Sequence, residues 1–149
     1  MKKVSLFFIG LLVLMQLFAP NIQPDKLDLK KDFLHCMAVP EEVAEILRRA
    51  CYDCHSDTPN YAWFDYLAPL SRYVVKKRER AKLSLNFSKW KEMEDWQKRL
   101  FLQGGIPYDI QTDRMPPKDY LWLHPDAKIS PHEKTLIDSW LSSLRFTKE

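Results

Sequence analysis

One short stretch limits the possible folds of this chain more than any other: Cys51-Tyr52-Asp53-Cys54-His55. Two thiols three residues apart lie on the same side of a helical turn, and a histidine follows directly. The chain has three cysteines among 149 residues, which are too few for a scaffold held together by disulfide bonds. We therefore expect the fold to be organised around this turn and the group that it binds.

The spacing Cys-x-x-Cys-His is typical of covalent attachment of c-type haem. The thiols of Cys51 and Cys54 would add to the two vinyl groups, and His55 would then lie beneath the iron as an axial ligand. This pattern predicts one covalent haem c. Three other interpretations stay open. They are a thioredoxin-like redox pair, which needs a preceding strand, a zinc site formed by Cys36, Cys51, Cys54 and a histidine, and a plain disulfide.

The first twenty residues differ in character from the rest of the chain. The charged start Met1-Lys2-Lys3 precedes an almost unbroken apolar run from Val4 to Ala19. This arrangement predicts that residues 1–20 are a signal sequence or a membrane anchor. Pro20 makes a poor cleavage site, which favours an anchor in the inner membrane. The remainder would then be periplasmic, on the outer face of that membrane, where haem c is attached.

Composition favours helices, because only three glycines accompany ten prolines and a sheet of tight hairpins would need more of them. We predict an all-α fold with a linker over 21–38, which is polar and extended or weakly ordered over 21–31, and one domain over 39–149. Helical spacing of apolar residues predicts four helices, over 41–53, 66–81, 88–103 and from residue 131 to about 144.

Two of these helices carry clear end signals. The helix over 88–103 would turn Trp90, Met93, Trp96 and Leu100 inward and stop at Gly104-Gly105. The last helix opens with Ser130-Pro131-His132-Glu133, a capping box with proline in the first turn.

A haem iron bound by one histidine still has a sixth coordination position, and Met115 is the strongest candidate ligand for it. Pro116-Pro117 forbids α-helical geometry at Met115 and stiffens the segment into an extended loop. Such a loop could hold a thioether at the iron. Two alternatives stay open, that Met115 is ordinary apolar filling and that His124 takes its place.

An aromatic cluster follows the cysteine motif, formed by Tyr61, Trp63, Phe64 and Tyr66. Flat apolar side chains suit the wall of a porphyrin site, so we expect Trp63, Phe64 and Tyr66 to contact the haem. Simple core packing would use the same residues.

The positive charge of the chain is local. The stretch from Lys76 to Lys82 holds five basic residues and one acidic residue, a net charge of +4, against +3 for the whole chain. It could attract an acidic redox partner or anionic lipid, or it could be the solvated face of a helix. An exported domain of this kind is not expected to bind nucleic acid.

Several of these elements together resemble the bacterial haem-binding domain family, whose members are small c-type cytochrome domains. The resemblance covers about Val39 to Leu144, and the matching elements are Cys51 to Ser56, Ala68-Pro69 with Ser71, Leu85 to Trp90, Met115-Pro116-Pro117 through Tyr120, Leu123-His124-Pro125, and Ala127 to Lys134 with Trp140. One departure is the stretch from Gly104 to Arg114, which is longer and more polar than the usual lead to Met-Pro-Pro.

The resemblance implies a cytochrome c-like helical fold with thioethers at Cys51 and Cys54, His55 as proximal ligand and Met115 as distal ligand. The expected function is then single-electron transfer between redox partner proteins in the periplasm, and not an enzymatic reaction. The alternative is a haem protein with an open or labile sixth site, which would reduce peroxide or sense a small molecule.

Overall fold

The computed structural model describes residues 2–23 and 26–144, which are helical or irregular with no strand among them. The helices are α1 (Lys2–Gln16), α2 (Phe33–Cys36), α3 (Glu41–Leu47), α4 (Asp53–His55), α5 (Leu70–Ser84), α6 (Asp95–Leu100), α7 (Ile106–Gln111), α8 (Lys118–Leu123) and α9 (Pro131–Ser143). Short 3₁₀ segments cover Trp63–Tyr66, Phe87–Glu92 and Pro125–Ala127, and π-helical turns cover Arg48–Tyr52 and Phe101–Gly105. The predicted all-α class is confirmed.

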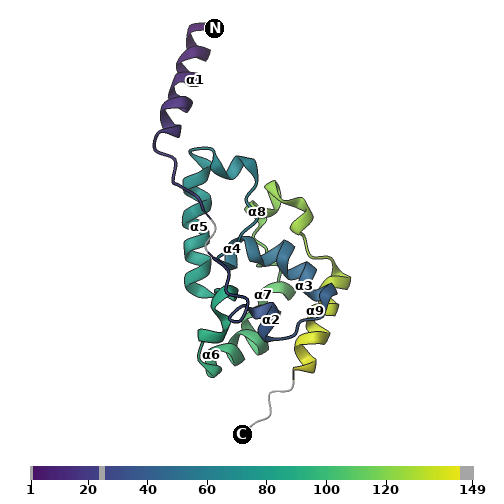
Figure 1. Ribbon diagram of the computed structural model, residues 1–149. Helices are drawn as coiled ribbons and strands as arrows, with labels where there is room; N and C mark the ends of the chain where they lie inside the picture. Colours follow the sequence, from purple (N-terminus) through teal and green to yellow (C-terminus); the bar gives the residue numbers. More distant parts are fainter. Residues whose placement is uncertain (1, 24–25, 145–149) are drawn as a thin grey trace.

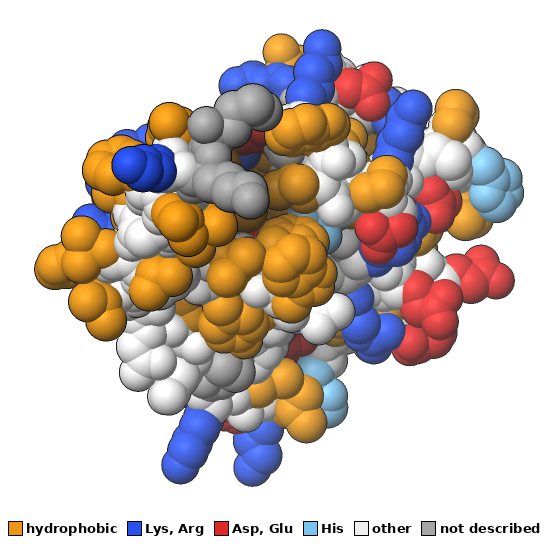
Figure 2. Space-filling view, turned by 90° about the horizontal axis from the view of Figure 1, so that it is seen from above, with side chains coloured by type: hydrophobic (Ala, Val, Ile, Leu, Met, Phe, Trp, Pro, Cys, Tyr) orange, Lys and Arg blue, Asp and Glu red, His pale blue; other side chains and the backbone are white. Residues whose placement is uncertain are grey.

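Helix α1 projects away from the rest of the molecule, as Figure 1 shows. Its base is attached by Gln16, whose amide nitrogen donates to the carbonyl of Ala68 at 3.1 Å and whose amide oxygen accepts from the Ala68 N–H at 3.0 Å. The guanidinium of Arg72 donates to the carbonyl of Phe18. Seen from above, with α1 toward the viewer, hydrophobic side chains cover much of the surface in view (Figure 2).

Within the part of the chain that the structure describes, no helix combines the length and the apolar character needed to span a bilayer.

The core lies where α2, α3 and α9 meet the 3₁₀ segment Phe87–Glu92. Phe33 and Trp90 are each 1% exposed, and their rings meet edge to face with centroids 4.7 Å apart. Phe33 also contacts Phe87 at 4.9 Å and Trp140 at 6.0 Å. The segment 21–38, which we predicted as a linker, therefore also contributes α2 and the buried ring of Phe33 to the core, because burial of an apolar side chain is favourable.

The predicted helix over 41–53 is confirmed as a continuous helical run of α3, the turn Arg48–Tyr52 and α4. Helix α5 starts directly after Pro69 and runs to Ser84, so it starts and ends a few residues later than the predicted range 66–81. Helix α9 begins as expected, because Ser130 accepts from the Glu133 N–H while the Glu133 carboxylate accepts from the Ser130 N–H.

The predicted helix over 88–103 is wrong. Met93 and Glu94 are extended, and Glu94 caps the new helix α6, so the helical phase restarts at this point. Trp90 is buried as expected, but Trp96 and Leu100 are 62% and 59% exposed. The two glycines do not end the helix either, because the turn Phe101–Gly105 continues into α7.

Candidate functional site

A cavity of about 330 Å³ opens between the cysteine motif, α5, α7 and the segment before α8. Cys51, Cys54 and His55 line one part of it, and Met115 lines it from a segment far along the chain. The volume falls within the range of small-molecule and cofactor sites. The structure therefore brings together the two thiols, the imidazole and the thioether that the sequence singled out.

Cys51 and Cys54 come from the turn Arg48–Tyr52 and from α4, so the helical run of α3 delivers both thiols to the cavity. The structure has no disulfide between them. Burial raises the pKa of Cys51 to about 12 and that of Cys54 to about 11, with a smaller contribution from the neighbouring thiol or from Asp53. Both side chains are therefore neutral thiols near pH 7.

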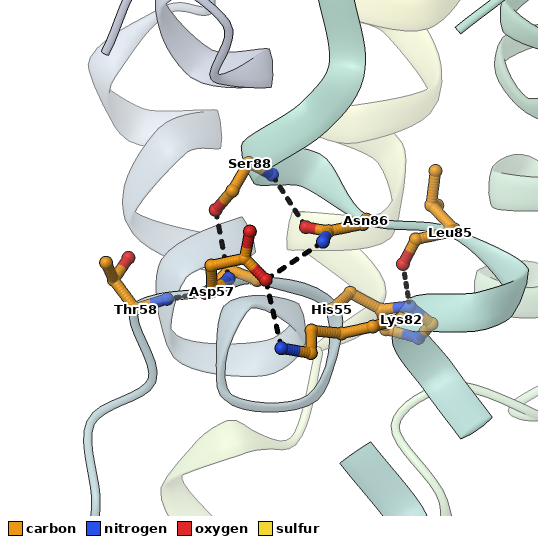
Figure 3. Close-up of polar contacts among 8 residues, drawn as sticks. His55, Asp57, Thr58, Lys82, Leu85, Asn86 and Ser88 are labelled. Atoms are coloured by element: carbon orange, nitrogen blue, oxygen red, sulfur yellow. Dashed lines mark hydrogen bonds and ion pairs between the residues drawn. The ribbon is translucent and has the colours of Figure 1, made fainter. Parts of the chain in front are cut away.

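The imidazole of His55 is oriented by the main chain at the end of α5. Its Nδ1 lies 2.9 Å from the carbonyl oxygen of Leu85, as Figure 3 shows. A carbonyl can only accept, so Nδ1 carries the proton and Nε2 keeps a free lone pair. Burial lowers the pKa of His55, which favours the neutral ring. A neutral imidazole with a fixed tautomer is a suitable ligand for iron.

The loop after His55 is attached to the same segment by Asp57. The Asp57 N–H donates to Ser88 Oγ at 3.0 Å, and its carboxylate accepts from Lys82 Nζ at 2.9 Å and from the Asn86 amide at 3.0 Å. Burial acts to raise the pKa of Asp57, but the hydrogen bonds from Lys82 and Asn86 outweigh it, and the pKa lies below its ordinary value. These contacts link the cysteine motif to the Leu85-Asn86-Phe87-Ser88 element (Figure 3).

The walls of the cavity are largely apolar, but they are not the aromatic residues that we predicted. The aromatic side chains that line it are Phe87, Phe101 and Tyr120. Phe87 and Tyr120 lie in elements of the family resemblance. The third, Phe101, lies over Gly105, where an added Cβ would come within 3.2 Å of the ring.

Trp63, Phe64 and Tyr66 do not line this cavity, so the structure does not support their predicted contact with a cofactor. Trp63 and Tyr66 are 75% and 48% exposed, and Phe64 contacts the ring of His124. The reason is that the chain leaves the cavity after His55 and reaches the start of α5 through the 3₁₀ segment Trp63–Tyr66. Proximity in sequence did not indicate proximity in space.

Met115 and His124 occupy different surroundings. Met115 is 36% exposed at the cavity, and its N–H donates to the carbonyl of Asp109 at 3.1 Å. His124 does not line the cavity. It stacks on Tyr120 with ring centroids 4.3 Å apart. Of these two candidate ligands, only Met115 shares a cavity with His55.

Tyr120 connects α8 to the cysteine motif, because its hydroxyl donates to Asp53 Oδ2 at 2.6 Å. The stretch from Gly104 to Arg114, which departs from the family pattern, supplies another wall. Ile106, Asp109 and Ile110 line the cavity from α7. The extra length therefore forms a helix at the site.

The other interpretations of the cysteines find no support in the described part of the chain. It contains no strand of the kind that a thioredoxin-like motif follows. No group of three or more His, Cys, Asp and Glu side chains is placed to hold a metal among the same residues. Cys36 lies exposed on α2, and its thiol donates to the carbonyl of Lys30.

Comparison with known proteins gives one match. The model of the family described as "Haem-binding domain" matches residues 10–143. No curated protein matches the chain, and no solved structure does. The family match covers most of the chain and includes all four residues that we expect to hold haem, so this chain is a member of the haem-binding domain family.

Proposed function

We propose that the protein is a monohaem c-type cytochrome that carries single electrons. In this proposal Cys51 and Cys54 form thioethers with one haem, and His55 and Met115 are the axial ligands of its iron. The observation that supports it best is that all four side chains line one cavity although Met115 lies far from the others in sequence. Haem, when bound, supplies the one-electron couple of its iron.

The donor set fits haem. Two neutral thiols lie three residues apart, the Nε2 lone pair of His55 is free, and a thioether and mainly apolar walls complete the cavity. The hydrogen bond from His55 Nδ1 to the Leu85 carbonyl holds the ring and increases its strength as a ligand. Phe87 and Phe101 present apolar rings to the cavity, and the polarity of the surroundings is one of the factors that set a haem potential.

The proposal also places the haem domain outside the cytoplasm, where covalent attachment of haem takes place. The charged start and the apolar run within residues 1–20 support export, with this segment as a signal sequence or an anchor in the inner membrane. The haem would then exchange electrons with redox partner proteins at the outer face of that membrane.

The first test is the mass of the exported protein. We expect the mass of the polypeptide plus one haem, and a mass that survives acid extraction because the attachment is covalent. The double variant Cys51→Ala/Cys54→Ala should lose the covalent haem mass, because no thiol of the motif is left to attach it, whereas Cys36→Ala, the matched control, should keep that mass. A wild-type protein without covalent haem would contradict the proposal.

The second test concerns the distal ligand. Met115→Ala should open the sixth position, lower the midpoint potential and allow carbon monoxide to bind the ferrous protein. His124→Ala is the matched control and should keep the wild-type spectrum, because His124 lies outside the cavity. Unchanged visible and near-infrared spectra in Met115→Ala would remove Met115 from the ligand set.

A second candidate function is peroxide reduction or small-molecule sensing at a labile sixth position. The partial exposure of Met115 favours it, because an exposed thioether is easier to displace than a buried one. Rapid reaction of the wild-type ferric protein with peroxide near pH 7 would support this candidate over electron transfer.

A further inference from the structure

Three charged side chains line the cavity together with the neutral His55: Lys77 and Arg80 from α5, and Asp109 from α7. Two of them already have partners. Lys77 forms an ion pair with Asp119, which also accepts from the Tyr73 hydroxyl. Asp109 lies 3.6 Å from the Arg114 guanidinium. The charges of these two side chains are therefore largely balanced within the protein.

Arg80 differs from both, because it makes no hydrogen bond and no ion pair within the described part of the chain. It is exposed at the edge of the cavity. Arg80 also lies on the side of α5 that faces the cavity, which it shares with Lys77, Ala81 and Ser84. Residues at these spacings lie on one side of a helix, so the guanidinium belongs to the wall of the site.

Haem brings two negative charges to such a site. Its two propionates lie on the edge opposite the two vinyl groups, which in this proposal face Cys51 and Cys54. Lys77 is close to Cys54, since the two residues also line a second, smaller cavity together. Arg80 lies one turn further along α5. The step from Lys77 to Arg80 therefore runs along α5 toward Leu85, at the other end of the cavity wall that this helix forms.

We propose that Arg80 binds a haem propionate. A guanidinium and a carboxylate can form two parallel hydrogen bonds, and no carboxylate of the described chain competes for Arg80. This inference rests on the proposed function, because it requires haem in the cavity. It also assigns a role within the site to part of the basic stretch from Lys76 to Lys82, which the sequence alone could not separate from a solvated helix face.

The alternative role of Arg80 is recognition of an acidic redox partner at the same edge. The two roles predict different results for the isolated holoprotein, because partner recognition does not change the vibrations of the haem. The variants to compare are Arg80→Ala, Arg80→Lys and Lys76→Ala. Lys76 is the matched control, since it is an exposed cation on the same helix and does not line the cavity.

The readouts are the covalent haem mass, the propionate bending band in the resonance Raman spectrum, and the midpoint potential. We expect Arg80→Ala to keep the haem and the axial ligands, to shift the propionate band and to lower the midpoint potential. Arg80→Lys should fall between Arg80→Ala and the wild type, and Lys76→Ala should match the wild type. If Arg80→Ala yields too little holoprotein, the comparison of Arg80→Lys with Lys76→Ala decides the question.

A propionate band and a midpoint potential in Arg80→Ala equal to those of Lys76→Ala would overturn the inference. An effect of Arg80→Ala confined to the salt dependence of electron exchange with an acidic partner would also overturn it, in favour of partner recognition. Failure of the proposed function is distinguishable from both, because the wild-type protein itself would then lack the haem mass.

Discussion

Replacing Phe33 by alanine tests whether the segment before α3 belongs to the core. The Phe33 side chain is 1% exposed and contacts three other rings, those of Phe87, Trp90 and Trp140. Truncating a buried phenylalanine costs roughly 3–5 kcal/mol, from lost apolar burial and from the cavity left behind. Because three of its neighbours are aromatic, we expect Phe33→Ala to lower the free energy of unfolding by about 4 kcal/mol. This is a large fraction of the typical stability of a domain.

For a chain of this length a loss of about 4 kcal/mol corresponds to a fall in Tm of roughly 12 °C. The assay is urea unfolding of the holoprotein followed by circular dichroism, with thermal melts in parallel. Leu29→Ala is the matched control, because Leu29 precedes Phe33 in the same segment but is 60% exposed. A loss of less than about 1 kcal/mol in Phe33→Ala, or one equal to that of Leu29→Ala, would refute the placement of Phe33 in the core.

Two further predictions concern the loop after His55 and the turn before α7. The pKa of Asp57 in the folded protein lies below its ordinary value of 3.8, so the stability that this carboxylate contributes is present above pH 3.8 and is lost as the pH falls through the folded pKa. Asp57→Asn should therefore be less stable than the wild type near pH 7. The difference in stability should shrink in acid denaturation curves measured below pH 3.8. Gly104→Ala should stabilise the protein by about 0.5–1 kcal/mol, because an added Cβ meets nothing within 4 Å. Gly105→Ala, in contrast, must displace the Phe101 ring and should shift the haem absorption bands. Equal effects of the two substitutions on stability and on the spectrum would contradict this reasoning.

The sequence predicted the parts of the site whose chemistry depends on a short local pattern. Cys51, Cys54 and His55 lie together because they share one helical turn, and Met115 reaches them as the resemblance to the family implied. The capping box at Ser130 likewise depends on atoms four residues apart at most. In patterns this short, the local helical backbone alone fixes how the residues lie relative to one another.

The errors arose where long-range packing decides the outcome. Trp63 follows the cysteine motif closely in sequence but is exposed, while Phe101 reaches the cavity from a turn that periodicity could not place. Gly104-Gly105 was readable only as a helix stop, because the close approach of the Phe101 ring to Gly105 leaves no signature in sequence. Phe33 was missed because the sequence does not show which of the scattered apolar residues of this segment, such as Leu29, Phe33 and Leu34, is buried.

The acceptor for His55 Nδ1 is a peptide carbonyl, that of Leu85, and this limits how the proximal ligand can be retuned. No exchange of the side chain at position 85 deletes a main-chain oxygen, so variants cannot switch the interaction off in one step. Its length depends instead on where the last turn of α5 stops, and Asn86 restrains that stop through Asp57. Engineering of the midpoint potential from the proximal side should therefore alter the length or the capping of α5.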